Sequence, residues 1–164
     1  MFFGGPAYTA IHVVISLVGI LSGVVVLAAM LAGRRLDRWI GLFLATTVAT
    51  SVTGFGFPFH HFLPSHAVGI LSLVVLAIAI YALYARQLAG AWRKTFVIAA
   101  VLALYLNVFV AIVQAFLKAP ALHALAPTQT EAPFKLTQLG VLALFVVLGV
   151  LAAVRFREER PPAA

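Results

Sequence analysis

Five long runs of uncharged, mostly apolar residues divide this chain and constrain its fold more than any other feature. They cover residues 11–32, 39–57, 67–85, 95–117 and 136–154. A helix needs about 20 mostly apolar residues to cross about 30 Å of hydrocarbon, and each run is close to that length. An α-helix also satisfies its backbone polar groups internally, as hydrocarbon demands. We therefore expect an all-α integral membrane protein, with one transmembrane domain over residues 1–164 built as a five-helix bundle.

The composition agrees with a chain surrounded by lipid. Of the 164 residues, 64% are hydrophobic and only 9% are charged, whereas soluble domains carry about 25% charged residues. The chain has no cysteine, which excludes disulfides, thiolate metal sites and cysteine nucleophiles. Residues 1–8 contain no basic side chain, so they lack the n-region of a cleaved signal peptide, and the first run is expected to remain as a span.

The basic residues predict the orientation of the bundle. With five spans, nine of the eleven Lys and Arg residues fall on one side of the membrane, and only Lys118 and Lys135 fall on the other. Positive charge marks the cytoplasmic side, which predicts an N-out, C-in topology in a bacterial inner membrane. Because the basic residues occupy short connections rather than one surface, we expect a lipid bilayer as partner and no nucleic acid. The nine are Arg34, Arg35, Arg38, Arg86, Arg93, Lys94, Arg155, Arg157 and Arg160.

The longest connection, residues 118–135, separates the fourth and fifth runs. It contains Pro120, Pro127 and Pro133. Proline inside a helix removes a hydrogen bond and clashes with the preceding turn. This spacing predicts a connection without helix.

A possible internal repeat relates the first two runs to the third and fourth. The tetrapeptide Gly-Ile-Leu-Ser occurs at residues 19–22 and again at residues 69–72, and each pair of runs is followed by a similar proline- and histidine-containing loop. Both copies would begin on the same side, which predicts a parallel repeat about an axis along the membrane normal. The fifth helix would then be an addition. Chance is the alternative, because short matches are common in apolar sequence.

All five histidines fall at or beyond the ends of the runs on the side opposite the arginines. Imidazole binds copper, zinc and haem iron. The repeat would pair His12 with His66 and His61 with His123, which makes these four the candidate metal ligands for copper or zinc. A pair on different helices could instead hold haem. The alternative is that these histidines bind nothing and are simply tolerated at the level of the lipid headgroups.

Two amides lie seven residues apart on one face of the fourth run, at Asn107 and Gln114. Such amides either bond to a neighbouring helix or bind a ligand group such as a quinone carbonyl. Polar and small residues also line one stripe of the first run and one of the second. We expect the hydroxyls of the second run to bond to carbonyls one turn back. The stripes predict a polar seam that opens where the histidines lie, with His12, His66, Asn107 and Gln114 as cofactor-binding candidates.

The sequence lacks the residues that several classes of function require. No Asp, Glu, Lys or Arg lies within the five runs, which argues against proton-coupled transport, and no metalloprotease or serine-elbow motif occurs. The sequence favours a non-enzymatic role. The leading hypothesis is a small membrane protein that binds haem, copper or zinc in electron transfer or metal handling. The alternatives are a non-catalytic subunit or anchor of a larger complex or homo-oligomer, and a passive channel or carrier.

Overall fold

A computed structural model describes residues 5–57 and 64–157, and every regular element in them is a helix. The π-helical turn η1 continues α3 without a break, so the two form one rod. The elements are α1 (Pro6–Leu31), α2 (Asp37–Gly54), α3 (Pro64–Ile80), η1 (Tyr81–Ala85), α4 (Ala91–Lys118), α5 (Pro120–Leu125) and α6 (Ala132–Arg155).

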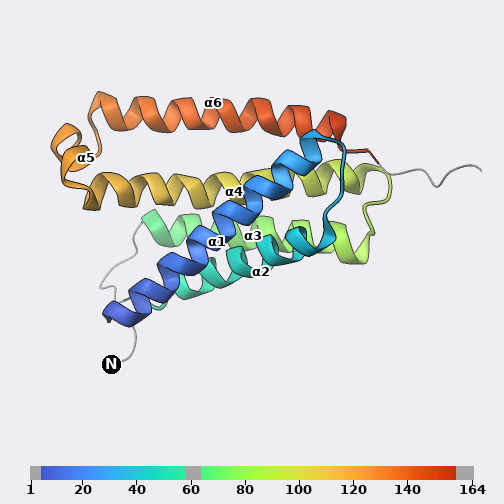
Figure 1. Cartoon of the computed structure of the whole chain (residues 1–164), viewed down its shortest axis with the longest axis horizontal. Helices are drawn as coiled ribbons and strands as arrows, with labels where there is room; N and C mark the ends of the chain where they lie inside the picture. Colours follow the sequence, from blue (N-terminus) through green and yellow to red (C-terminus); the bar gives the residue numbers. More distant parts are fainter. Residues whose placement is uncertain (1–4, 58–63, 158–164) are drawn as a thin grey trace, which may run out of the picture.

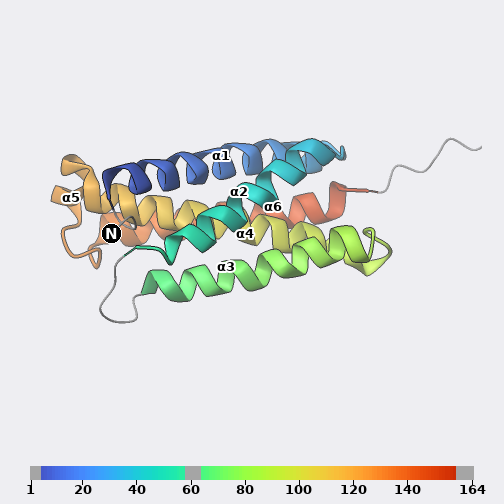
Figure 2. The same cartoon turned by 90° about the horizontal axis from the view of Figure 1, so that it is seen from below.

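The first four long helices form a ring in which each packs against the next, and α4 closes the ring on α1. The rods run along a common long axis (Figure 1). Contacts across the ring, between α1 and α3 or between α2 and α4, are few. The last helix, α6, packs on the outside against α4 and α1, as the view from below also shows (Figure 2). The ring therefore has an interior that the four helices share.

Four helices are long and apolar enough to cross a membrane, as expected of an integral membrane protein. They are α1, the continuous rod formed by α3 and η1, α4 and α6. Helix α2 is not among them, because it begins with Asp37 and Arg38 and carries a stripe of hydroxyl residues. Five spans were expected, and four helices have the length and hydropathy that a span needs. Hydropathy leaves open whether α2 crosses the membrane.

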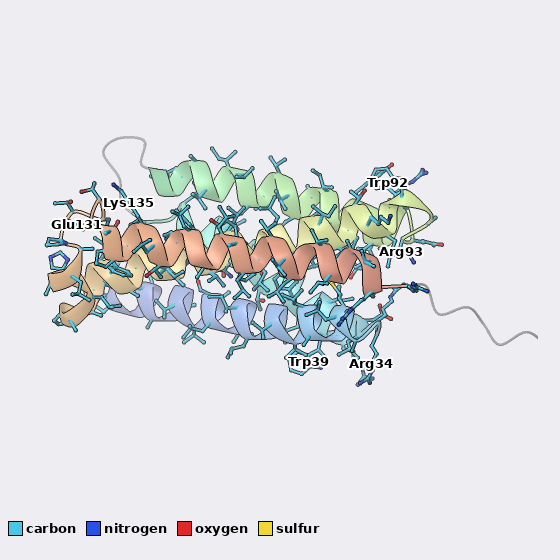
Figure 3. The ribbon with its side chains drawn as sticks, turned by 90° about the horizontal axis from the view of Figure 1, so that it is seen from above. Arg34, Trp39, Trp92, Arg93, Glu131 and Lys135 are labelled. Carbon is cyan, nitrogen blue, oxygen red and sulfur yellow. The ribbon has the colours of Figure 1, made fainter. Side chains whose placement is uncertain are left out.

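Different charged and aromatic residues lie at the two ends of the bundle and distinguish them. Arg34, Trp39, Trp92 and Arg93 lie at one end, which we call the arginine end, and Glu131 and Lys135 lie at the other (Figure 3). His12, in the second turn of α1, and His66, in the first turn of α3, lie toward that second end, which we call the histidine end. At the arginine end, the Arg86 guanidinium lies 5.3 Å from the centre of the Trp92 ring, a cation–π contact.

The tightest packing fills the half of the ring nearer the arginine end. Its largest fully buried side chains include Met30, Phe43, Leu76, Phe96 and Leu104, contributed by all four ring helices. Gly23 lets α1 approach this cluster closely, since a Cβ there would lie 2.6 Å from Leu104 Cδ1 and 2.9 Å from the Phe43 ring. The close helix approach made possible by Gly19 and Gly23 is a known use of small residues in membrane helices.

The prediction that the connection after α4 lacks helix was wrong. Residues Pro120–Leu125 form α5, and α6 begins at Ala132 with Pro133 in its first turn. Proline is tolerated in the first turn because that N–H has no intrahelical partner in any case. Pro120 and Pro133 therefore lie at the starts of helices and do not exclude them.

The proposed repeat stays a prediction. Helices α1 and α2 form one antiparallel pair and α3 and α4 form another, each joined at the arginine end. The second pair contains the π-helical turn, in which the Arg86 N–H donates to the Tyr81 carbonyl at 3.0 Å. Within the described residues, α1 is α-helical throughout, so the two pairs differ at this turn.

Candidate functional site

A cavity of about 540 Å³ occupies the half of the ring nearer the histidine end. All four ring helices contribute to its lining, which reaches from Thr9 to Ile20 along α1 and from Leu106 to Lys118 along α4. Twelve residues of helix correspond to about 18 Å, so the cavity extends from the end of the bundle to near its middle. Ligand pockets in proteins commonly measure about 300–1,000 Å³, and this cavity is of that size.

The cavity wall combines apolar surface with a few polar groups. Leu17, Ile20, Leu106 and Val110 supply much of the apolar part. Lys118, at the last residue of α4, is the only Lys, Arg, Asp or Glu among the described residues of the lining. A wall of this kind suits an uncharged molecule, because a buried charge would find no opposite charge deeper in the cavity.

The structure brings all four predicted cofactor-binding residues to this one cavity. His12 comes from α1, His66 from α3, and Asn107 and Gln114 from α4. The two histidines reach it from helices that barely touch each other. The predicted polar seam, including Ser16, lies along the same wall.

His12 is held by a hydrogen bond that fixes which ring nitrogen faces outward. Its Nδ1 lies 2.8 Å from Thr53 Oγ1, and the Thr53 hydroxyl donates its own proton to the Ala49 carbonyl at 2.7 Å. With the hydroxyl proton directed to the Ala49 carbonyl, the imidazole donates from Nδ1. This tautomer leaves a lone pair on Nε2, available to a metal ion or a hydrogen-bond donor. The His12 ring also packs edge-on against Phe57, with centroids 5.1 Å apart.

His66 is buried, with 7% of its surface exposed, and its ring stacks on Phe55 at a centroid distance of 5.8 Å. The same phenyl ring fills the space beside Gly69, where an added Cβ would lie 2.9 Å from Phe55 Cζ. Phe55 thus packs the end of α2 against the first turns of α3, next to the cavity.

Most hydroxyls of the α2 stripe bond to their own helix, as predicted. Thr50 donates to the Thr46 carbonyl at 2.9 Å and Ser51 donates to the Thr47 carbonyl at 3.0 Å. Thr47 departs from this pattern, because its Oγ1 is buried without a hydrogen-bond partner. Across the cavity, the Nδ2 of Asn107 is also buried and unpaired.

The predicted metal quartet is only partly assembled by the described residues. His12 and His66 line the cavity, His123 is exposed on α5, and His61 lies outside the described residues. Within residues 5–57 and 64–157, no three His, Asp or Glu side chains come together closely enough to hold a metal ion. The copper or zinc quartet therefore stays a prediction.

Phe55, Phe57 and Lys118 also line the cavity, and they were not among the predicted site residues. Phe55 and Phe57 follow the α2 stripe directly and carry the aromatic signal that could have marked them. Lys118 ends the fourth apolar run, a position that also suits a simple interfacial anchor.

Comparisons of this chain with models of protein families, with curated proteins and with solved structures found no match.

Proposed function

We propose that this protein binds a neutral, lipophilic small molecule in the cavity between α1, α2, α3 and α4. The observation that carries the proposal is the convergence of His12, His66, Asn107 and Gln114 on one largely apolar cavity of about 540 Å³. Apolar walls with a few converging polar groups are typical of small-molecule sites. Polar side chains within membrane helices are costly and usually serve a function or a helix contact.

The packed half of the ring supports binding rather than passage. Toward the arginine end from the cavity, Phe43, Phe96 and Leu104 are fully buried in one cluster. A passive channel needs a continuous path, and these side chains lie across it. A non-catalytic subunit or homo-oligomer remains compatible with ligand binding, since α6 exposes most of its apolar surface.

Extraction of the purified protein tests this proposal. The protein would be isolated in native-lipid particles, and its bound molecules would be extracted and identified by mass spectrometry. We expect one lipophilic compound in near-equimolar amount, enriched over the surrounding lipid. Equal amounts of every compound in the particle and in protein-free membrane would contradict the proposal.

We also propose that α2 is a fifth span and that the arginine end faces the cytoplasm of a bacterial inner membrane. Its 18 residues reach about 27 Å, and α2 packs against α1 more extensively than any other pair of helices. Its hydroxyls mostly donate to carbonyls of the same helix, which lowers the cost of placing them in the membrane. Arg34, Arg86 and Arg155 then share the side that the positive-inside rule assigns to the cytoplasm.

Topology reporters fused after Arg38, Arg86 and Ala126 test this arrangement. We expect cytoplasmic readings at Arg38 and Arg86 and an external reading at Ala126. If α2 did not cross, only the rod of α3 and η1 would separate the first two positions, and they would read on opposite sides. That outcome would reduce the bundle to four spans.

Haem binding is a second candidate function, favoured by the tautomer of His12. A haem-ligating histidine typically donates from one ring nitrogen to a fixed acceptor and binds iron through the other. His12 has this arrangement through Thr53, and His66 lines the same cavity. Together they would hold the haem iron, and Lys118 would supply positive charge for the porphyrin carboxylates.

Absorption spectra and metal analysis test the haem candidate. We expect a Soret band in wild-type protein that His12→Ala or His66→Ala removes, since each loses an iron ligand. His123→Ala is the matched control, because His123 lies exposed on α5 outside the cavity. Copper and zinc would be measured in the same samples. A wild-type spectrum without a Soret band, obtained from cells supplied with a haem precursor, would exclude this candidate.

A further inference from the structure

Two buried polar atoms at the deep end of the cavity have no hydrogen-bond partner in the protein. They are Oγ1 of Thr47, a residue with 2% of its surface exposed, and Nδ2 of Asn107, with 9% exposed. Both residues line the cavity. A buried donor that is left unpaired costs about 1–3 kcal/mol, so atoms of this kind in a cavity point to a bound partner.

Gly19 brings these two atoms around one small recess. A Cβ at this position would lie 3.1 Å from Asn107 Nδ2 and 3.3 Å from Thr47 Oγ1. A methyl group would crowd both polar atoms, so the absence of a side chain at Gly19 leaves them uncovered where α1, α2 and α4 meet. We call the space bounded by Gly19, Thr47 and Asn107 the amide recess.

Neighbouring hydroxyls are already committed, which singles out the amide recess. Thr46 donates to the Leu42 carbonyl at 2.7 Å and Ser16 donates to the His12 carbonyl at 2.9 Å. Among the cavity-lining residues that the structure describes, the buried donors without a partner are the Asn107 amide and the Thr47 hydroxyl. An amide nitrogen donates only, so the group that fits must accept a hydrogen bond.

The surroundings of the recess select a neutral acceptor on a lipophilic molecule. Within the part of the lining that the structure describes, the only Lys, Arg, Asp or Glu is Lys118, eleven residues farther along α4 and so about 16 Å away. A carboxylate or phosphate at the recess would be buried without a counter-charge. A carbonyl oxygen is neutral and accepts two hydrogen bonds. Leu17, Ile20, Leu106 and Val110 offer apolar surface to the rest of the molecule.

We propose that the amide recess binds a carbonyl oxygen of a quinone ring, with the Asn107 amide and the Thr47 hydroxyl as its donors. A quinone combines a neutral carbonyl acceptor with a flat apolar ring, and its lipid tail would leave through the histidine end of the cavity. Phe55 and Phe57 provide aromatic surface there. This inference rests on the proposed function, since it names the class of molecule that the cavity holds.

The test uses full-length protein in nanodiscs and decylubiquinone as probe. The retained quinone is measured on immobilised nanodiscs, after subtraction of the amount held by protein-free nanodiscs. We expect Asn107→Leu and Thr47→Val each to weaken binding by up to about tenfold, the effect of one lost hydrogen bond. Gly19→Ala should weaken it similarly, because its Cβ would crowd the two donors at 3.1 and 3.3 Å.

Matched controls separate loss of the recess from loss of folding. Gly41→Ala is the control for Gly19→Ala, because nothing lies within 4 Å of a Cβ at position 41. Gln138→Leu is the control for Asn107→Leu, because Gln138 is a buried amide on α6 outside the cavity lining. Both should bind decylubiquinone like wild type. An infrared spectrum adds a second readout: the carbonyl stretch of bound quinone should shift to lower frequency, and Asn107→Leu should reverse that shift.

The outcomes distinguish this inference from the function it rests on. Equal binding and an equal infrared shift in wild type and Asn107→Leu would overturn the recess as the carbonyl site. No retention of decylubiquinone, with another lipophile extracted from the purified protein, would overturn the quinone assignment and leave the binding function intact. Absence of any enriched lipophile would overturn both.

Discussion

Replacing Gly23 by alanine is expected to lower the free energy of unfolding by about 1–3 kcal/mol, the usual cost of overpacking a filled core. The new methyl group would lie 2.6 Å from Leu104 Cδ1 and 2.9 Å from two atoms of the Phe43 ring. Both neighbours are only 1% exposed, so they have no free space to move into. Unfolding would be followed by circular dichroism in mixed micelles with increasing SDS.

Gly41→Ala provides the control for that experiment. Gly41 also lies inside a helix, α2, but an added Cβ there meets nothing within 4 Å. Alanine favours helix over glycine by about 1 kcal/mol, so this variant should be as stable as wild type or slightly more so. Equal stability of Gly23→Ala and wild type would show that α1 does not approach α2 and α4 as closely as described.

Replacing Ala111 by phenylalanine is expected to abolish ligand binding, with a loss of about a hundredfold or more, equivalent to about 2.7 kcal/mol. Ala111 lines the cavity on α4 between Asn107 and Gln114, and a phenyl ring there would occupy space that the ligand needs. The measurements are the amount of lipophile extracted per protein molecule and the retention of decylubiquinone.

Ala77→Phe is the matched control for Ala111→Phe. Ala77 lies exposed on α3 and outside the cavity lining, so a phenyl ring there would meet surrounding lipid. It should leave both measurements unchanged. Undiminished binding in Ala111→Phe would mean that the ligand sits elsewhere on the protein.

Apolar runs predicted where the long helices lie but not where they end. The first run was expected to begin at residue 11, whereas α1 begins at Pro6, and the third was expected to begin at residue 67, whereas α3 begins at Pro64. Hydropathy indicates which residues favour a lipid environment, but it does not indicate where a helix begins or ends. Helix ends depend on proline in the first turn and on capping, which lie outside the apolar stretch. The same reason explains why α5 was missed.

The polar side chains of the site could be identified from sequence because such residues are scarce in this chain. Periodicity placed Asn107 and Gln114 on one face, and the polar stripes predicted a seam that the cavity matches. The amide recess could not be foreseen. Its geometry depends on where Gly19, Thr47 and Asn107 meet across three helices, and a residue's hydrogen-bond partners are known only once helix rotations are fixed. Thr47 looked like its neighbours Thr50 and Ser51, whose hydroxyls bond locally.

The cavity stops near the middle of the bundle, and the packed cluster around Phe43 and Phe96 fills the other half. A bilayer is two monolayers, and this division assigns the binding site to one of them. A lipophile dissolved in the opposite leaflet would have to cross the bilayer unaided before it could bind. Occupancy of the site would therefore follow the concentration of its ligand in a single leaflet, so the protein would respond to compositional asymmetry of the membrane and not to the total amount of ligand.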